Sequence, residues 1–374
     1  MEFSFKMKFN RKKPYNDLPL LPPKFDVESK KILKATISAS RCLAELKKIG
    51  EQIPNQNVLI RTIPRLEAQG SSEIENIFTT SDKLFQYASN NKTTTDLATK
   101  EAEQYCAALY KGVSEVKKRP ICTNTAVNIC KVILNIDINI RKIPGTAIKN
   151  YVSDEIIYTP PEGEKLIREK LANLEKFINM ENNIDPLIRM AIMHYQFEAI
   201  HPFSDGNGRT GRILNILFLI QENLLEIPVL FLSRYIIQNK SEYYSRIRDV
   251  SESGKWEAWI LFMLKAVEET AVWTSEKIKA IKNLLAHTCD FVSRKQPNIY
   301  SRELVEMIFI QPYCRINNLV DAKIAQRQTA SSYLKELANI DVLKEIKIGR
   351  EKLFLHPKFL KLLTTDENSF KEYK

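Results

Sequence analysis

The chain has 374 residues, of which 44% are hydrophobic and 27% charged, and these proportions are typical of soluble globular proteins. A single core rarely serves more than about 300 residues, so the length predicts two or three domains. No run of about 18 uncharged apolar residues occurs, which argues against a membrane span. The basic N-terminus lacks the apolar region and cleavage site of a secretory signal. The net charge of +11 suits phosphate-bearing ligands or nucleic acid without choosing between them.

The cysteines and histidines argue against disulfides and zinc. The six cysteines form no Cys-x-x-Cys pair, and several lie within apolar segments. We therefore expect reduced, buried thiols and a cytoplasmic protein. The four histidines stand in unrelated settings, which disfavours a His/Cys zinc site.

Helical periodicity dominates the N-terminal half. Apolar residues three and four apart predict helices over 32–46, 82–88, 99–116 and 122–134. A short helical piece is expected around Glu73, with Ser71 or Ser72 capping its start and Glu75 in its first turn.

Residues 141–163 interrupt this pattern. Pro144-Gly145 indicates a turn, and the β-prone residues 156–159 end at two prolines. We expect a short β-hairpin or an extended flap within a helical protein.

Two helices are predicted around a glycine-rich loop. Asp185-Pro186 is a typical helix start, with Asp as the N-cap and Pro at the first helical position. That helix ends before His201, and the next begins near Gly208.

The C-terminal pattern differs from the rest. Two short helices are predicted within 298–322 and a third over 328–337, before a hairpin that turns at Gly349-Arg350. This order is the outline of a winged helix-turn-helix. The expected organisation is thus mainly α: an N-terminal helical region (1–95), a helical core with a hairpin flap (96–285) and a winged-helix domain (290–374).

Residues 201–212, HPFSDGNGRTGR, concentrate the chemistry of the chain. Gly206, Gly208 and Gly211 lack Cβ atoms, so backbone N–H groups can approach an anion closely. The following helix adds the positive end of its dipole. The Gly-Lys-Ser/Thr ending of a P-loop is missing.

Four side chains of this loop complete a candidate phosphate-transfer site. Arg209 and Arg212 lie three residues apart on the first helical turn, so both can reach oxygens of one polyphosphate. Asp205 is suited to hold Mg²⁺, which usually binds one or two carboxylates together with phosphate oxygens. His201 is suited to accept a proton at neutral pH.

The twelve residues resemble the signature of the Fic (Fic/DOC) family, His-Pro-Phe-x-Asp/Asn-Gly-Asn-Gly-Arg-x-x-Arg, at every fixed position. The similarity extends over about residues 100–270. It implies a Fic helical core and a protein adenylyltransferase, which uses ATP and Mg²⁺ to transfer AMP to a Ser, Thr or Tyr hydroxyl of a target protein.

The resemblance also implies roles for individual residues. His201 would be the general base and Asp205 the Mg²⁺ ligand. The nucleotide would be bound by Gly206, Asn207, Gly208, Arg209, Thr210, Gly211 and Arg212. The related Doc kinases carry Lys where this chain has Gly208, and that difference favours adenylylation over phosphorylation.

Two further segments resemble elements of the family, and a third is described below. Ile157, Tyr158 and Thr159 match the flap that aligns a target strand, although a plain structural hairpin remains an alternative. Tyr243 and Tyr244 match the region that borders the adenine, or else belong to ordinary helix packing.

Residues 70–80 resemble the family's inhibitory motif, here Ser71, Glu75 and Asn76. Glu75 would pair with Arg212 and compete with the γ-phosphate for its guanidinium. Because the motif precedes the core in the same chain, the resemblance implies intramolecular inhibition by an N-terminal helix (class II).

Other reactions on the same fold, and one function of another class, stay open. On the same fold the reaction can be transfer of UMP or phosphocholine, or removal of AMP. A nucleotide-sensing DNA-binding regulator is the alternative of another class, with Gln328, Thr329, Ser331, Ser332, Lys335 and Arg350 facing a groove. Residues 297–360 carry a charge of only +3, so DNA is not favoured over target docking. We also expect self-modification, a homodimer and no membrane partner.

Overall fold

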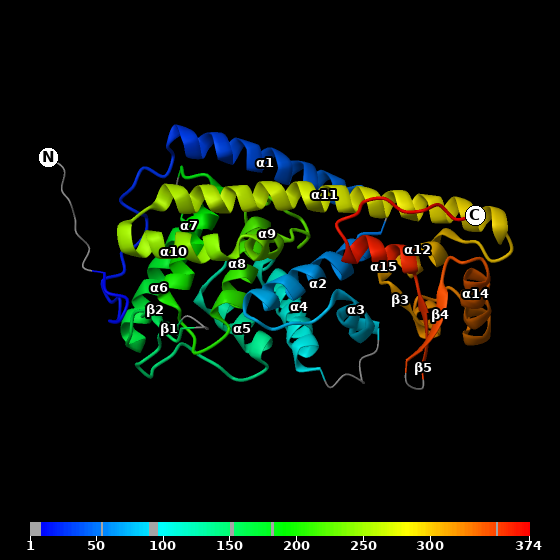
Figure 1. Cartoon of the computed structure of the whole chain (residues 1–374), viewed down its shortest axis with the longest axis horizontal. Coiled ribbons are helices and arrows are strands. Elements are labelled where there is room, and N and C mark those ends of the chain that lie inside the picture. Colours follow the sequence, from blue (N-terminus) through cyan, green and yellow to red (C-terminus); the bar gives the residue numbers. More distant parts are fainter. Residues whose placement is uncertain (1–8, 54, 90–95, 150–152, 181–182, 349–350) are drawn as a thin grey trace.

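The computed structural model describes residues 9–53, 55–89, 96–149, 153–180, 183–348 and 351–374, and it is mainly helical, as predicted (Figure 1). In its N-terminal and central parts the helices are α1 (Lys30–Glu51), α2 (Asn57–Ile74), α3 (Ser81–Ser89), α4 (Leu97–Val116), α5 (Thr123–Leu134), α6 (Glu164–Asn179), α7 (Pro186–Ile200), α8 (Asn207–Gln221), α9 (Leu232–Gln238), α10 (Lys240–Ser253) and α11 (Trp256–Lys295). In the described part of the chain, no helix is both long and apolar enough to cross a membrane.

Helices α7 and α8 form the centre of the molecule. Almost every residue of both is buried, because α8 packs against α7, α4 and α5. The approach of α4 to α8 depends on Gly112, where a Cβ atom would lie 2.6 Å from a methyl carbon of Leu217. The loop between α7 and α8 therefore rests on a rigid support.

Helix α2 corrects the expectation for residues 70–80. These residues do not begin a helix; α2 ends at Ile74, and Glu75 is its C-cap. The helix continues through Pro64, which has no N–H to donate to the carbonyl of Ile60. The hydroxyl of Tyr110 donates to that carbonyl instead, over 2.5 Å. A partner from α4 thus compensates for the proline, and sequence periodicity does not reveal such a partner.

The predicted hairpin consists of two short antiparallel strands, β1 (Ile148–Lys149) and β2 (Ile156–Tyr158), in which Ile148 pairs with Tyr158. Residues 150–152 of the connection lie outside the described residues. The hairpin lies beside α6 and α7, at the end of the molecule opposite the C-terminal helices (Figure 1).

The C-terminal part contains α12 (Arg302–Ile310), β3 (Tyr313–Cys314), α13 (Ile316–Asp321), α14 (Arg327–Asn339), β4 (Lys344–Ile348), β5 (Glu351–Leu355) and α15 (Pro357–Thr364). Its antiparallel sheet has the order β3-β5-β4. Three helices followed by a hairpin is the predicted order, and the assignment to the winged-helix class stays a prediction. The predicted tip, Gly349 and Arg350, lies outside the described residues.

Helix α11 connects the two parts. It has 40 residues and is therefore about 60 Å long at 1.5 Å per residue. Helix α1 lies along its first half, and α12 and α15 pack against its second half (Figure 1). The domain boundary expected near residues 285–290 falls inside this continuous helix, so it marks no break in the chain.

Candidate active site

The loop between α7 and α8 is fixed at both ends by its backbone. Asp185 caps the start of α7 by accepting a hydrogen bond from the N–H of Leu187, and His201 ends the helix in a left-handed conformation with φ of 49°. Gly206, with φ of 79°, is the N-cap of α8. The Asn207 side chain closes the turn, because it accepts a bond from the Phe203 N–H and donates one to the Phe203 carbonyl, both over 2.9 Å.

His201 is held as a neutral imidazole. Burial lowers its pKa to about 4, and the positive charge of Arg141 acts in the same direction. The nearby charges of Glu75 and Asp205 oppose this shift. A neutral ring can accept a proton, as a general base must.

The guanidinium of Arg212 lies against the end of α2, where it contacts Ser71 and Glu75. Its Nη2 lies 2.6 Å from Glu75 Oε1 and donates to the Ser71 carbonyl over 2.9 Å, while its Nε donates to Ser71 Oγ over 2.7 Å. Burial disfavours the Glu75 carboxylate, but the charge and hydrogen bond of Arg212, together with electrostatic contributions from Arg209 and His201, lower the pKa of Glu75. The two side chains therefore form an ion pair between a buried guanidinium and a partly exposed carboxylate.

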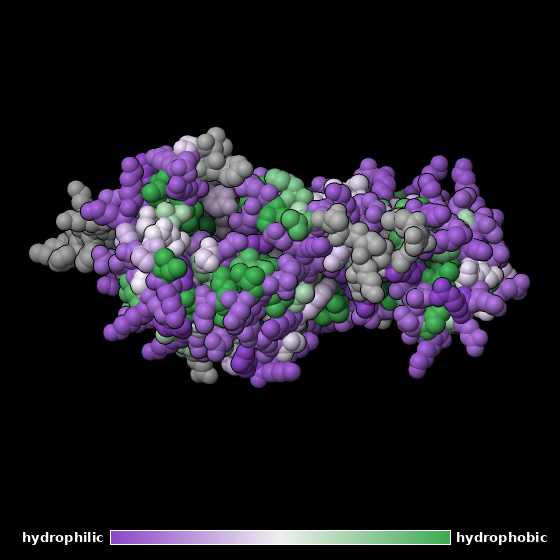
Figure 2. Space-filling model, turned by 90° about the horizontal axis from the view of Figure 1, so that it is seen from below, coloured by the Kyte–Doolittle hydropathy of each residue, from purple (hydrophilic) through white to green (hydrophobic). Residues whose placement is uncertain are grey.

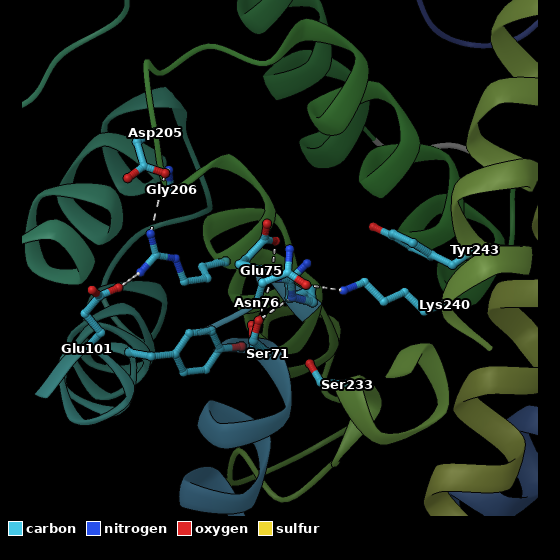
Figure 3. A network of polar contacts seen from close by, with 12 residues as sticks. Ser71, Glu75, Asn76, Glu101, Asp205, Gly206, Ser233, Lys240 and Tyr243 are labelled. Atoms are coloured by element: carbon cyan, nitrogen blue, oxygen red, sulfur yellow. Dashed lines mark hydrogen bonds and ion pairs between the residues drawn. The ribbon is translucent and has the colours of Figure 1, made fainter. Parts of the chain in front are cut away.

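The chain turns immediately after Glu75. Asn76 is left-handed, with φ of 63°, and its side chain accepts a hydrogen bond from Lys240 Nζ of α10 over 3.1 Å (Figure 3). Space for the carboxylate comes from Gly208, where a Cβ atom would lie 2.1 Å from Glu75 Oε1. Gly208 is thus the residue of α8 that permits the Glu75–Arg212 contact.

Arg209 points to the other side of α8, toward α4. Its Nη1 lies 2.9 Å from Glu101 Oε2, and its Nη2 lies 3.6 Å from Asp205 Oδ1 (Figure 3). The Arg209 side chain is only 4% exposed, whereas that of Asp205 is 71% exposed. Sequence patterns did not single out Glu101, because its partner is 108 residues away.

A cavity of 980 Å³ opens beside this network. It is lined by residues from α2, the hairpin, α7, α8 and α10. Of the residues predicted to act, the following line it: Glu75, Asn76, Ile157, Tyr158, His201, Gly208, Arg212, Tyr243 and Tyr244. Tyr243 is buried and Tyr244 is 45% exposed.

Gly211 has a different position from the one predicted. A Cβ atom there would lie 2.5 Å from Glu198 Oε1 and 3.1 Å from a ring carbon of Phe197, so this glycine serves the packing of α8 on α7 rather than an approach to an anion. Thr210 is fully buried in the same turn. Neither residue lines the cavity.

Two polar residues of α7 near the cavity were missed. Glu198 lines the cavity, and burial raises its pKa to about 7. His194 Nε2 lies 2.8 Å from the Tyr243 hydroxyl, and burial lowers the pKa of this histidine to about 3. His194, Glu198 and His201 are spaced i, i+4 and i+7, so a polar stripe on an otherwise apolar helix was the available signal.

The predicted flap residues differ in their contacts. The Tyr158 hydroxyl donates to the Ala199 carbonyl over 2.8 Å, and the Tyr158 ring stacks on Phe9 at 6.1 Å between centroids. Thr159 is engaged by the N-terminal segment: its hydroxyl donates to the Arg11 carbonyl over 2.7 Å, and its carbonyl accepts from the Tyr15 N–H over 3.0 Å. Residues 9–15 thus pack on the flap, and no sequence motif indicated this contact.

The donors fit a magnesium ion shared with a nucleotide better than one held by the protein alone. No group of three or more His, Cys, Asp or Glu side chains is arranged to hold a metal among the described residues. Asp205 offers one exposed carboxylate beside the first turn of α8. Mg²⁺ bound to a nucleotide commonly takes one or two protein carboxylates and phosphate oxygens.

Three family models match the chain. Residues 33–114 match the Fic/DOC family N-terminal model, residues 131–219 match the Fic/DOC family model, and residues 284–359 match the C-terminal domain of SoFic-like protein adenylyltransferase. The second match contains the whole loop and His201.

Curated relatives share part of this region. Protein adenylyltransferase fic-1 of Caenorhabditis briggsae is 27% identical over 157 residues, which are 41% of this chain and 28% of the relative. A probable protein adenylyltransferase of Aquifex aeolicus (strain VF5) is 31% identical over 106 residues, 27% of this chain and 30% of the relative. The chain thus spans less than a third of the length of these relatives.

Solved structures extend the similarity of fold. A Fic family protein from Desulfovibrio desulfuricans G20 superposes with a TM-score of 0.54 at 17% identity, over 90% of this chain and 98% of that chain. Fic-1 (residues 134–508) from C. elegans superposes with a TM-score of 0.51 at 18% identity, over 68% of this chain and 74% of that chain. These superpositions show that the chain has the fold of these proteins, and the family-model matches show that it contains Fic/DOC family domains over residues 33–114 and 131–219.

Proposed function

We propose that the chain is a protein adenylyltransferase that transfers AMP from ATP to a side-chain hydroxyl of a target protein and is inhibited by its own Glu75. The observation that carries the proposal is the meeting of three groups at one cavity: a partly buried, neutral imidazole, the first turn of α8 and a buried arginine. Relatives named protein adenylyltransferases support this choice of reaction.

His201 would act on the target hydroxyl. Its neutral imidazole accepts the hydroxyl proton as the oxygen attacks the α-phosphorus of ATP. The bond from the α-phosphorus to the bridging oxygen of the β-phosphate breaks, and pyrophosphate leaves. The product is a phosphodiester between the target side chain and AMP, so atoms and charges balance.

The first turn of α8 would bind the phosphates. Its N–H groups have no partners within the helix, and the helix dipole favours an anion there. Arg212 would neutralise the terminal phosphates, and Tyr243 and Tyr244 would border the adenine. Mg²⁺ supplies further charge neutralisation to the triphosphate when it is bound, and Asp205 is the residue that would hold it.

Glu75 would inhibit by occupying Arg212. A γ-phosphate and the Glu75 carboxylate would compete for the same guanidinium, whose Nε and Nη2 are already bonded to α2. Ser71 adds two acceptors on the same side, so α2 holds Arg212 at three points. Release of Glu75 from Arg212 is then a condition for productive ATP binding.

The test compares wild-type protein, Glu75→Gly and the double variant Glu75→Gly/His201→Ala, each incubated with labelled ATP, Mg²⁺ and cell lysate. We expect label on protein, including self-modification, to rise at least tenfold in Glu75→Gly and to vanish in the double variant. Mass spectrometry of labelled peptides should show an added AMP on Ser, Thr or Tyr. No gain of label in Glu75→Gly would refute the inhibitory role.

The same measurements separate the other reactions. Addition of UMP or phosphocholine to protein, seen when a donor of that group replaces ATP, would change the donor and keep the site. Loss of AMP from a modified protein would make removal the reaction. Nucleotide-dependent DNA binding that persists in His201→Ala would favour the alternative function of a nucleotide-sensing DNA-binding regulator.

A further inference from the structure

Arg141 is a buried cation to which no catalytic or binding role has yet been given. It is only 7% exposed, and each hydrogen bond that its guanidinium makes among the described residues goes to a main-chain carbonyl. Its Nε donates to the His201 carbonyl over 2.8 Å, and its Nη2 donates to the carbonyls of Pro161 and Ile200. Its own backbone N–H donates to the Pro202 carbonyl over 2.9 Å.

These acceptors belong to two functional elements. Ile200, His201 and Pro202 form the end of α7, where the helix dipole leaves partial negative charge and free carbonyls. Pro161 follows the flap strand β2, and Arg141 itself begins the segment that contains the flap. One guanidinium therefore ties both ends of the flap segment to the backbone of the histidine.

The His201 backbone needs such support. With φ of 49° and ψ of 60°, it lies in the left-handed region, which a side chain with a Cβ atom rarely adopts. Strained conformations persist where surrounding contacts fix them. Here the carbonyl of His201 itself accepts a hydrogen bond from Arg141. The orientation of the imidazole thus depends on a contact outside the loop signature.

We propose that Arg141 is a positioning residue that sets the distance between a target strand docked on the flap and the imidazole that takes its proton. A displacement of about 1 Å between reacting groups can cost on the order of a hundredfold in rate. Arg141 holds the two elements that fix this distance. The proposal rests on the proposed function, since it assigns the residue to that reaction.

A residue that only stabilises the fold would behave differently, and Arg189 provides a matched control. Arg189 is also buried, and it lies at the start of α7, opposite the end that Arg141 contacts. There it donates to the Ile178 carbonyl over 3.1 Å and pairs with Glu222. Substitution of Arg189 should lower the free energy of unfolding without changing the positions of the flap or of His201.

Transfer kinetics give the first test, all in the Glu75→Gly background with a target identified from lysate. For Arg141→Met we expect kcat/KM for the target to fall at least tenfold, with a higher KM for the target and ATP affinity within twofold of the parent. Arg141→Lys keeps the positive charge but loses the branched guanidinium that reaches several carbonyls. Its kcat/KM should lie between those of the parent and Arg141→Met. Arg189→Met should keep both KM and kcat.

A second readout needs no transfer. The imidazole resonance of His201 in the full chain, assigned by its absence in His201→Ala, is followed by NMR as pH is lowered. Arg141, Glu75 and Asp205 are the charged groups that act on it, so removal of the cation in Arg141→Met should raise the titration midpoint. Arg141→Lys and Arg189→Met should leave it near the wild-type value.

The kinetic and NMR measurements distinguish failure of the Arg141 proposal from failure of the proposed function. If Arg141→Met keeps both the His201 midpoint and the target KM while losing stability as Arg189→Met does, Arg141 is structural and the proposal is wrong. If Glu75→Gly transfers nothing to any protein, the proposed function is wrong. The NMR comparison then still decides whether Arg141 acts on His201.

Discussion

At the scale of single residues, Gly208 joins the predicted nucleotide site to its predicted inhibitor. The loop signature requires glycine here for the approach of an anion, and the structure adds a second reason. The Glu75 carboxylate occupies the space that a side chain at 208 would fill, since a Cβ atom there would lie 2.1 Å from Glu75 Oε1. One position thus serves two competing anions.

This double use predicts a non-additive effect on stability. In the parent chain, Gly208→Ala must push Glu75 away from buried Arg212 and should lower the free energy of unfolding by about 1–3 kcal/mol. In Glu75→Gly the carboxylate is gone, and only Arg212 Nη1, 3.0 Å from the same Cβ position, has to adjust. The same change should then cost less, about 1 kcal/mol or under. Urea denaturation of the four variants gives the coupling energy, and additive effects would contradict the contact.

Glu67 is a buried carboxyl of α2 that accepts bonds from the Ser233 N–H over 2.9 Å, the Ser233 hydroxyl over 2.6 Å and the Tyr105 hydroxyl over 3.1 Å. Burial raises its pKa to about 7, well above its usual value of 4.5. The folded state therefore holds the proton more tightly than the unfolded state. The stability that Glu67 contributes is fully present below pH 4.5 and is lost as pH rises through 7.

Glu67→Gln should remove this dependence on pH. Between pH 4.5 and 7 the stability of wild type relative to Glu67→Gln should fall by on the order of 3 kcal/mol, from 1.36 kcal/mol for each pKa unit. Denaturation curves at several pH values measure the difference. Replacement of the exposed Glu303 by Gln is the control and should leave the curves parallel to wild type.

At the scale of elements, the contact of α4 with α8 fixes the support of the loop. Gly112 of α4 faces Leu217 of α8, and a Cβ atom would come within 2.6 Å of it. Gly50 near the end of α1 has no heavy atom within 4 Å of the same position. Two helical glycines in one chain thus differ only in their surroundings.

These surroundings predict opposite results for the same substitution. Gly112→Ala should destabilise the protein by about 1–3 kcal/mol, because Leu217 must move within a packed core. Gly50→Ala should be neutral or stabilise by up to about 1 kcal/mol, since alanine favours the helix and meets no atom. Thermal unfolding of both variants checks this. Equal effects would show that the α4–α8 contact is looser than described.

Sequence patterns predicted the elements that depend on local signals and missed those that depend on distant partners. Asp185-Pro186 located the start of α7, because a cap and a proline act within one turn. The course of α2 through Pro64 depends on Tyr110, 50 residues from the carbonyl that it serves. No local pattern contains that information.

The candidate site divides in the same way. The loop residues and the Glu75–Arg212 pair followed from motifs, although Glu75 ends a helix rather than beginning one. Glu101, Glu198 and the N-terminal segment at Thr159 had no motif, because their positions arise from the packing of separate helices. Gly211 was given an anion-binding role that its contact with Glu198 does not support.

At the scale of the whole molecule, α11 makes the C-terminal part continuous with the core. The C-terminal segment reinforces this connection: Lys277 of α11 donates to the carbonyls of Thr365 and Glu367, and Arg234 of α9 pairs with Asp366 at 2.8 Å. Most of the surface in Figure 2 is hydrophilic, with hydrophobic residues in separate small patches. The homodimer stays a prediction.

The charge of the C-terminal part bears on the DNA alternative. Of the residues expected to face a groove, Gln328, Thr329, Ser332 and Lys335 are exposed on α14 and Ser331 is half-buried. Only Arg327 and Lys335 bring positive charge to this helix, and Glu336 offsets one of them. Non-specific binding to duplex DNA depends on the number of phosphates neutralised, so this helix supplies little of it.

We therefore expect the double charge reversal Arg327→Glu/Lys335→Glu to leave binding to random duplex DNA unchanged within about twofold at 50 and 200 mM salt. Any binding should be weak and should come from positive charge elsewhere, since the chain as a whole carries +11. Fluorescence anisotropy with labelled duplex measures the affinity of the wild-type protein and of the double variant. A loss of tenfold or more, with a shallower dependence on salt, would instead make α14 a DNA-binding helix, because the loss of phosphate contacts reduces the dependence of binding on salt.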